Sequence, residues 1–226
     1  MTGAPTILVM AKASRAGRVK TRLHPLLGPA GCAALQAELL RHAVATALAT
    51  GRRVVVAVDS PDARGQIREL IADLGAVELI RQCGGHLGAR MTMAAGDALP
   101  DGGHLVVIGT DAPTLTEDLL TRAFTALDAG SSAVIGPAVD GGYYLLGLRW
   151  PAPDAFAIDP ALWSGEQVAA ATIARLRRRA PGGVAQLPVL RDLDTPEDAA
   201  ALICDPALPP AVARGLSPAR TLVVTP

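Results

Sequence analysis

Two kinds of apolar pattern alternate along the chain. Short aliphatic and β-branched runs are typical of strands buried on both faces of a sheet. Longer Ala- and Leu-rich stretches predict helices between them. The expected strands cover residues 6–10, 53–58, 77–80, 105–108, 133–137, 143–148 and 186–190. The expected helices cover residues 29–50, 87–98, 117–129 and 166–179, with another starting after Ser60 or Asp62 and a short one capped by Thr195.

This alternation predicts an α/β protein with a mostly parallel sheet and helices on both faces, a Rossmann-like three-layer α/β/α architecture. A chain of 226 residues fits one domain, which we expect to span residues 1–204. Prolines at 206, 209, 210, 218 and 226 punctuate residues 205–226. We expect that segment to be an irregular tail on the surface, or an arm that reaches a second copy in a homodimer.

Composition excludes several classes of protein. Hydrophobic residues make up 50% of the chain, yet no apolar run approaches the roughly 18 residues of a membrane span. Residues 7–11 are too few for the core of a signal peptide, which favours a cytoplasmic location. The net charge of zero gives no reason to expect a nucleic-acid partner. The 3 cysteines form no Cys-x-x-Cys pair, so neither a disulfide framework nor a zinc site is expected.

Positive charge is concentrated after the first expected strand. No Asp or Glu precedes Glu38, and residues 12–22 hold five cations, including Lys12 and Lys20, the two lysines of the chain. A cationic loop at the carboxyl end of a strand can wrap phosphates, and a lysine suits phosphate as a point charge. The loop is neither a Walker A motif nor Gly-x-Gly-x-x-Gly. The alternative is a solvated basic surface.

An apolar run at 105–108 leads into Gly109, Thr110 and Asp111. Ligands of open α/β sheets bind outside the carboxyl ends of strands, and a carboxylate there suits a divalent cation with its phosphates. The alternative is that Asp111 only caps the following helix.

Two further segments carry carboxylates. Asp140 precedes two glycines that let a ligand approach the backbone, and adjacent tyrosines point to opposite faces of a strand. The alternative there is an Asp-Gly hairpin turn. Asp192 and Asp194 share one face of an extended segment. Residues 195–198 have the pattern of a helix start.

In this order, the segments 12–23, 109–113, 136–147 and 192–198 resemble a bacterial branch of the A-type glycosyltransferase fold. That branch contains nucleotide-diphospho-sugar transferases, including glycosyltransferases linked to arsenosugar biosynthesis. The resemblance spans about residues 7–202. More distantly, the chain is similar to 2-phospholactate and molybdenum-cofactor guanylyltransferases. Relatives usually have Pro at Ser14 and Ala16, and their Asp-x-Asp metal signature is reduced here to Asp111.

The resemblance implies a nucleotide-diphospho-sugar transferase fold and dependence on Mg²⁺ or Mn²⁺. The phosphate-binding residues it implies are Lys12, Lys20, Arg22, Arg90 and Gly109. The metal ligands it implies are Asp111 and Asp194, with Asp192 as a further candidate. The substrate pocket it implies is formed by Asp140, Gly141, Gly142, Tyr143 and Trp163. Other matching positions near the nucleotide or acceptor are Gln82, Leu87, Gly88, Met91, Ile158 and Ser164.

The function that this reasoning favours is transfer of a sugar from a nucleotide-diphosphate sugar to a small acceptor. A cation on Asp111 would neutralise the leaving group, and Asp140 is the preferred general base ahead of Glu166 and His86. The first alternative is a guanylyltransferase-like nucleotidyltransferase that joins a nucleoside triphosphate to a phosphorylated acceptor and releases pyrophosphate. The second is a nucleotide-binding module without turnover. The released product separates these alternatives.

Overall fold

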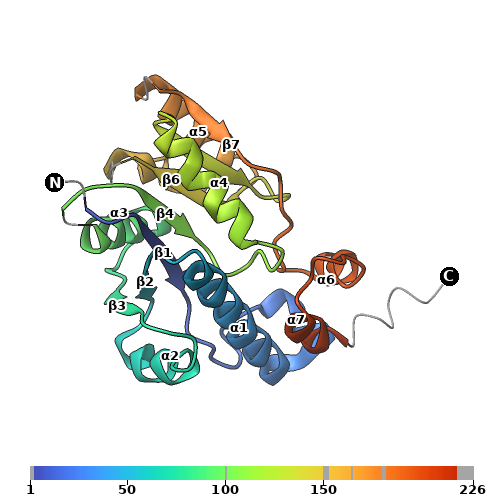
Figure 1. Cartoon of the computed structure of the whole chain (residues 1–226). Helices are drawn as coiled ribbons and strands as arrows, with labels where there is room; N and C mark the ends of the chain where they lie inside the picture. Colours follow the sequence, from blue (N-terminus) through green and yellow to red (C-terminus); the bar gives the residue numbers. More distant parts are fainter. Residues whose placement is uncertain (1–2, 100, 150–152, 164, 180–181, 218–226) are drawn as a thin grey trace.

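A seven-stranded sheet forms the middle layer of the molecule in the computed structural model, which describes residues 3–99, 101–149, 153–163, 165–179 and 182–217 (Figure 1). The strands are β1 (Thr6–Ala11), β2 (Arg53–Val58), β3 (Glu78–Arg81), β4 (Leu105–Ile108), β5 (Ala133–Pro137), β6 (Tyr143–Leu148) and β7 (Val184–Gln186). Their order is β3-β2-β1-β4-β6-β5-β7, and β6 runs antiparallel to both of its neighbours. The remaining pairings are parallel, as the sequence predicts.

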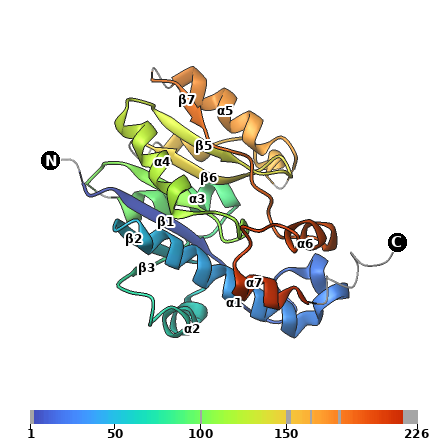
Figure 2. The same ribbon diagram turned by 45° about the vertical axis from the view of Figure 1, so that its right-hand side comes forward.

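Helices cover both faces of this sheet. The α-helices are α1 (His24–Ala49), α2 (Arg64–Leu70), α3 (Leu87–Ala98), α4 (Glu117–Asp128), α5 (Val168–Arg179), α6 (Pro196–Leu202) and α7 (Pro210–Gly215). Short 3-10 helices are η1 (Thr21–Leu23), η2 (Pro61–Ala63), η3 (Pro153–Phe156) and η4 (Pro160–Leu162). Buried residues of α1, α2 and α4 share one core cluster, and those of α3 and α5 share another. Figure 2 shows these two layers on either side of the sheet, so the predicted three-layer fold is confirmed.

The strands are apolar on both faces because each face has its own core. In β1, Ile7 and Val9 pack in the cluster of α1 and α4, whereas Leu8 packs in that of α3. All three side chains are fully buried. This alternation accounts for the uninterrupted apolar runs in the sequence.

The boundaries of α1 and β7 differ from the sequence prediction. The helix predicted from Pro29 is regular from that residue, but α1 also includes the turn from His24, joined across a kink at Gly28 with φ 67°. β7 starts two residues before and ends four residues before the predicted strand at 186–190. Pro188 has no N–H to donate to a sheet ladder, which ends the strand before it.

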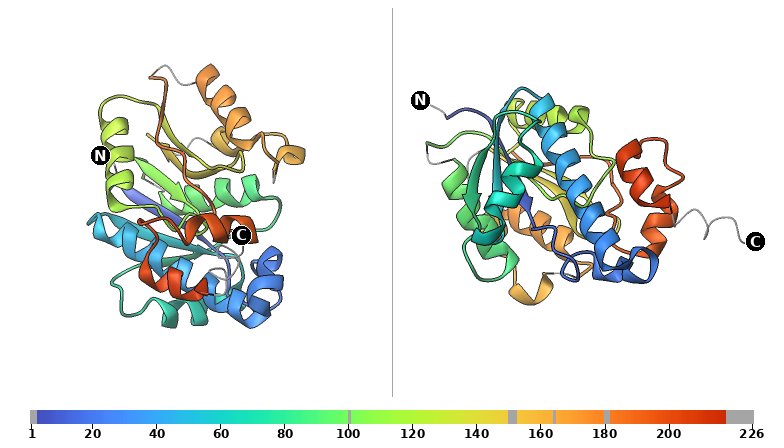
Figure 3. Two further views of the ribbon diagram at one scale, coloured as in Figure 1. Left: turned by 90° about the vertical axis from the view of Figure 1, so that its right-hand side faces the viewer. Right: turned by 90° about the horizontal axis from the view of Figure 1, so that it is seen from below.

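The predicted irregular tail is wrong for residues 210–215, which form α7. Pro210 lies in the first turn of α7, where its missing N–H costs nothing. Figure 3 shows α6 and α7 beside the amino-terminal end of α1. These three helices share a third apolar cluster that includes Leu35, Leu202 and Val212. Residues 218–226 of the predicted tail lie outside the described part of the chain.

None of the helices in the described residues is both long and apolar enough to cross a membrane.

Candidate functional site

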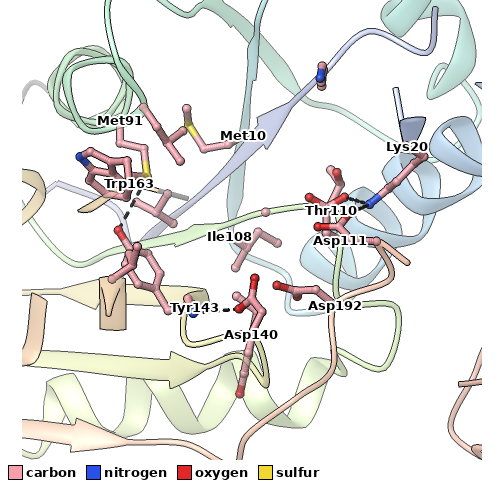
Figure 4. A pocket seen from close by; sticks show the side chains of 18 of the residues that line it. Met10, Lys20, Met91, Ile108, Thr110, Asp111, Asp140, Tyr143, Trp163 and Asp192 are labelled. Atoms are coloured by element: carbon pink, nitrogen blue, oxygen red, sulfur yellow. Dashed lines mark hydrogen bonds and ion pairs between the residues drawn. The ribbon is translucent and has the colours of Figure 1, made fainter. Parts of the chain in front are cut away.

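A cleft of about 570 Å³ opens at the carboxyl ends of β1 and β4. The amino end of β6 lies at the same edge because that strand is antiparallel. Figure 4 shows the side chains that line the cleft. Thirteen residues singled out from the sequence are among them: Lys12, Lys20, Arg22, Leu87, Met91, Gly109, Asp111, Asp140, Gly142, Tyr143, Trp163, Asp192 and Asp194.

Lys20 lies between two of the predicted carboxylates. Its Nζ donates to Asp111 Oδ1 in a very short contact and to Asp194 Oδ1 at 2.8 Å. Asp111 follows the central strand β4, and Asp194 precedes α6. The Leu193 amide donates to the Asp111 carbonyl at 2.8 Å and fixes the two segments side by side. The carboxylates from these two segments therefore share one cation, and that cation is the Lys20 ammonium.

The alternative interpretation of the basic loop as a solvated surface is wrong for Lys20. Only 4% of its side chain is exposed. Burial acts to lower its pKa, but attraction from Asp111 and Asp194 outweighs burial, so the pKa is raised. A run of positive charge usually marks a solvated surface, and a buried member of such a run gives no separate signal in the sequence.

Asp192 faces several other carboxylates in the cleft. Burial raises its pKa to about 8, and repulsion from Asp111, Asp140 and Asp194 acts in the same direction, opposed by Lys20. Asp192 therefore holds its proton more strongly than an ordinary aspartate does.

The three predicted metal ligands do not form a preassembled metal cluster. No group of three or more His, Cys, Asp or Glu side chains is arranged to hold a metal ion in the described residues. Asp111 and Asp194 converge on one position, the one that the Lys20 ammonium takes. Both are oxygen donors with side chains nearly half exposed, which fits a hard divalent cation.

The Asp140 segment forms a tight turn at the cleft. Asp140 Oδ1 accepts a hydrogen bond from the Gly142 amide at 2.8 Å, which orients the carboxylate. Gly141 has φ 86°, and a Cβ there would lie 2.1 Å from the Glu166 carbonyl oxygen. Gly141 thus brings the turn against the start of α5 and does not line the cleft. The hairpin turn and the cleft-facing carboxylate are both present in this segment.

The two adjacent tyrosines point to opposite faces of β6, as predicted. Tyr143 meets the Trp163 ring edge to face at 6.5 Å between centroids and donates its hydroxyl to Met91 Sδ at 3.9 Å. Tyr144 is buried on the other face and donates to the Pro188 carbonyl at 3.0 Å. Gly136 leaves room for the Tyr144 ring, because a Cβ there would lie 2.3 Å from that ring.

The basic loop is fixed by apolar anchors and by the end of β2. Val19 is 1% exposed, and the Ala13 amide donates to Asp59 Oδ1 at 2.9 Å. The loop also lines a second cavity of about 460 Å³. Its lining residues are Lys12, Ala13, Arg15, Gly17, Arg18, Thr21, Asp59 and Ser60. Lys12 and Thr21 line both spaces, so the second cavity adjoins the main cleft.

Other residues chosen from the sequence have structural positions outside the cleft lining. Gln82 is buried and donates to the Ala11 and Ala57 carbonyls, and its Oε1 accepts from Arg90 at 3.3 Å. His86 caps α3 through the Ala89 amide. Glu166 is exposed and Ile158 is buried, and neither lines the cleft. Gly88 packs against Trp163, and Ser164 lies outside the described residues.

Sequence reasoning missed Gln36, Thr110 and Met10 as lining residues. Gln36 is 3% exposed and donates to Thr110 Oγ1 at 3.1 Å, which ties α1 to the segment that carries Asp111. The available signal was a glutamine on the otherwise apolar buried face of α1. Met10 gave no such signal, because one residue at the end of a strand has no periodicity of its own.

Comparison with known proteins identifies a family and a curated relative that match parts of this chain. A family model described as "Uncharacterized protein conserved in bacteria (DUF2064)" matches residues 39–164. A phosphoenolpyruvate guanylyltransferase from Rubrobacter xylanophilus is 35% identical over 187 residues, covering 81% of this chain and 86% of that protein.

Solved structures agree on the fold. The crystal structure of a "putative nucleotide-diphospho-sugar transferase" from Desulfovibrio desulfuricans has a TM-score of 0.84 and 27% identity, covering 97% of this chain and 96% of that one. A cytidylyltransferase from Leptospira borgpetersenii shares the fold alone, with a TM-score of 0.54 and 12% identity over 97% of this chain and 94% of that one.

Proposed function

This chain belongs to the DUF2064 family of bacterial proteins, and we propose that it is a nucleotidyltransferase that couples a nucleoside triphosphate to a small phosphorylated acceptor. It is a transferase with the fold of enzymes that act on nucleotides. The proposal concerns the group that is transferred and the acceptor that receives it.

The observation that carries the proposal is the continuity of the basic loop across two spaces. Lys12 and Thr21 line both the main cleft and the second cavity, and Arg15 and Arg18 extend the positive charge beyond them. A triphosphate has more charge and length to accommodate than the diphosphate of a nucleotide sugar. A loop that continues its cationic lining past the cleft suits the longer polyphosphate.

The acidic end of the cleft supplies carboxylates that suit a divalent cation. Asp111 and Asp194, with Asp192 nearby, are the residues that would hold Mg²⁺ or Mn²⁺. Such a cation, when bound, screens the negative charge of the phosphates at the reacting centre. Arg22 and Lys12 would hold phosphate oxygens by direct charge-assisted hydrogen bonds.

In this reaction an acceptor phosphate oxygen forms a bond to the α-phosphorus of the nucleotide. The bond from that phosphorus to the oxygen bridging to the β-phosphate breaks, and pyrophosphate leaves with the electron pair. An acceptor phosphate is already ionised at neutral pH, so this chemistry needs no general base. The similarity to a guanylyltransferase supports GTP and an acceptor such as phosphoenolpyruvate as the first pair to test.

Glycosyl transfer is the second candidate, and Asp140 is the observation that favours it. An acceptor hydroxyl must lose a proton, and the Asp140 carboxylate lines the cleft, oriented by the Gly142 amide. The similarity to the Desulfovibrio protein supports this candidate as well.

The released product distinguishes the two reactions. The purified chain is incubated with each nucleoside triphosphate, phosphoenolpyruvate and Mg²⁺ or Mn²⁺, and pyrophosphate is measured. We expect pyrophosphate to appear only with nucleotide, acceptor and metal together. A parallel set with nucleotide sugars measures nucleoside diphosphate. Release of nucleoside diphosphate in that set, without pyrophosphate in the first, would favour glycosyl transfer.

A further inference from the structure

Lys20 has a backbone conformation that residues other than glycine rarely adopt. Its φ is 48° and its ψ is 41°, in the left-handed region, and no other non-glycine residue among those described has a positive φ. Such a conformation is unfavourable for a residue with a Cβ. The conformation coincides with a lysine side chain that is 4% exposed.

The partners of the buried ammonium are the residues that the proposed function assigns to the divalent cation. Nζ contacts Asp111 and Asp194. The segments that carry these two residues are held side by side by the hydrogen bond from the Leu193 amide to the Asp111 carbonyl. Two carboxylates this close repel one another unless a cation lies between them. The single charge of the ammonium can balance only one of the two.

We propose that Lys20 is an internal counter-cation that holds Asp111 and Asp194 together and that is displaced into the cleft when a divalent cation binds them. The inference rests on the proposed function for the identity of the metal ligands. A divalent cation balances both carboxylates and prefers their oxygens. Lys20 then offers its three N–H donors to the cleft that it already lines with Lys12 and Arg22.

Displacement makes metal binding and phosphate binding interdependent. While Lys20 is paired with Asp111 and Asp194, its positive charge is balanced by protein carboxylates. Once displaced, the same charge is available to a polyphosphate. The class of ligand favoured is therefore a polyphosphate accompanied by a divalent cation, with the metal increasing the affinity of the cleft for the phosphates.

The scarcity of lysine in this chain makes the displacement measurable. The chain has two lysines, and Lys12 is exposed and lines the same cleft, so it serves as an internal reference. The wild-type chain is acylated with an amine-reactive reagent at fixed ionic strength, with and without Mn²⁺ and without nucleotide. Peptide mass spectrometry then gives the labelling rate of each lysine.

We expect Lys20 to label much more slowly than Lys12 in the metal-free protein, because its side chain is buried and its Nζ is paired with two carboxylates. Saturating Mn²⁺ should raise the rate at Lys20 by about tenfold relative to Lys12, since both the burial and the ion pairs are removed. Unchanged protection of Lys20 at a Mn²⁺ concentration that saturates binding would overturn the proposal.

A second measurement uses matched variants. Titration of Mn²⁺, with the free ion followed by electron paramagnetic resonance, is compared for the wild type, Lys20→Met and Lys12→Met. Removing the competing ammonium should strengthen Mn²⁺ binding by about tenfold in Lys20→Met, and Lys12→Met should change it much less. Equal effects of the two variants, weaker binding in Lys20→Met, or no Mn²⁺ binding in either would contradict the proposal.

These measurements contain neither a triphosphate nor an acceptor. They can fail while pyrophosphate is still released in the activity assay, and they can succeed while that assay fails. Failure of the inference is therefore distinguishable from failure of the proposed nucleotidyl transfer.

Discussion

Asp111 combines a fixed backbone with a half-exposed side chain. Its carbonyl accepts the Leu193 amide, and its carboxylate meets Lys20, with 45% of the side chain exposed. The main chain and the side chain of Asp111 therefore have separate roles. The main chain joins the segment after β4 to the segment before α6, and this hydrogen bond does not depend on the side chain. A ligand could therefore take over the Asp111 carboxylate from Lys20 without disturbing this backbone link.

The substitution Asp111→Asn should separate the structural role of the Asp111 backbone from the ligand-binding role of its carboxylate. The amide keeps the shape but loses the charge that a divalent cation needs, so metal-dependent nucleotide binding should fall by about tenfold or more. The free energy of unfolding should fall by about 1 to 2 kcal/mol, because Lys20 keeps its second partner, Asp194. Isothermal titration with Mn²⁺ and nucleotide, and urea unfolding, measure the two effects.

Asp140→Asn is the matched control for this substitution. Asp140 lines the same cleft, and an asparagine there can still accept from the Gly142 amide. Its metal-dependent nucleotide binding should stay close to the wild type. If Asp111→Asn binds metal and nucleotide as the wild type does, Asp111 serves only the structure.

At the scale of elements, α6 places one half of the acidic site. Thr195 and Asp198 cap this helix reciprocally, and Asp198 Oδ2 also accepts from the Asp194 amide at 3.3 Å. Asp198 Oδ1 accepts from Arg191 at 2.9 Å. The cap recognised in the sequence at 195–198 thus also orients the backbone that presents Asp194 to the cleft.

The same cap makes the stability that it contributes dependent on pH. Burial opposes ionisation of Asp198, but hydrogen bonds from Arg191, Thr195 and the Asp194 amide outweigh it, and the pKa is lowered. The stabilisation is present above the unfolded-state pKa of about 3.9 and is lost as the pH falls through the lower folded-state pKa. Asp198→Asn should cost about 1 to 2 kcal/mol at neutral pH.

Urea unfolding of both proteins as a function of pH tests this prediction. The difference between wild type and Asp198→Asn should shrink as the pH falls below the folded-state pKa of Asp198. The exposed neighbour Glu197, replaced by Gln, is the control and should have little effect at any pH. A difference that persists unchanged in acid would show that packing, not charge, is what the substitution removes.

The helix α7 is the element that the sequence reading missed. Val212 is fully buried in the cluster with Leu35 and Leu202, so Val212→Ala should cost about 1 to 3 kcal/mol by deleting buried methyl groups. Arg214→Ala, at an exposed position of the same helix, should stay within about 0.5 kcal/mol of the wild type. Thermal and urea unfolding compare the two variants, and equal small effects would mean that α7 does not pack on α1.

At the scale of the whole molecule, the sequence was sufficient wherever one local pattern decides the structure. The strand at 105–108 and the cap at Thr195 follow from patterns of a few residues, and both are confirmed. Failures occurred where distant segments decide. The prolines near 210 looked like breakers, yet one begins a helix whose partner is α1. Lys20 looked solvated because its two partners lie 91 and 174 residues further along the chain.

The sheet joins two chemically different halves, and the cleft lies between them. On the side of β1, the basic loop offers Lys12 and, in the adjoining cavity, Arg18. On the side of β6, Tyr143, Met91 and Trp163 form an apolar wall. Figure 4 shows Trp163 and Lys20 at opposite sides of the cleft. We expect the polyphosphate to bind the first side and the carbon skeleton of the acceptor to contact the second.

Two substitutions test this division through steady-state kinetics in the pyrophosphate assay. Arg18→Ala should raise the KM for the nucleotide severalfold by removing a charge-assisted contact, and leave the KM for the acceptor within about twofold. Trp163→Leu should do the reverse, because it removes aromatic surface from the acceptor side without changing the charge near the phosphates. Thermal unfolding of both variants confirms that they are folded at the assay temperature. If each substitution raises both KM values together, the two substrates do not occupy separate halves of the cleft, and their assignment to its opposite sides is wrong.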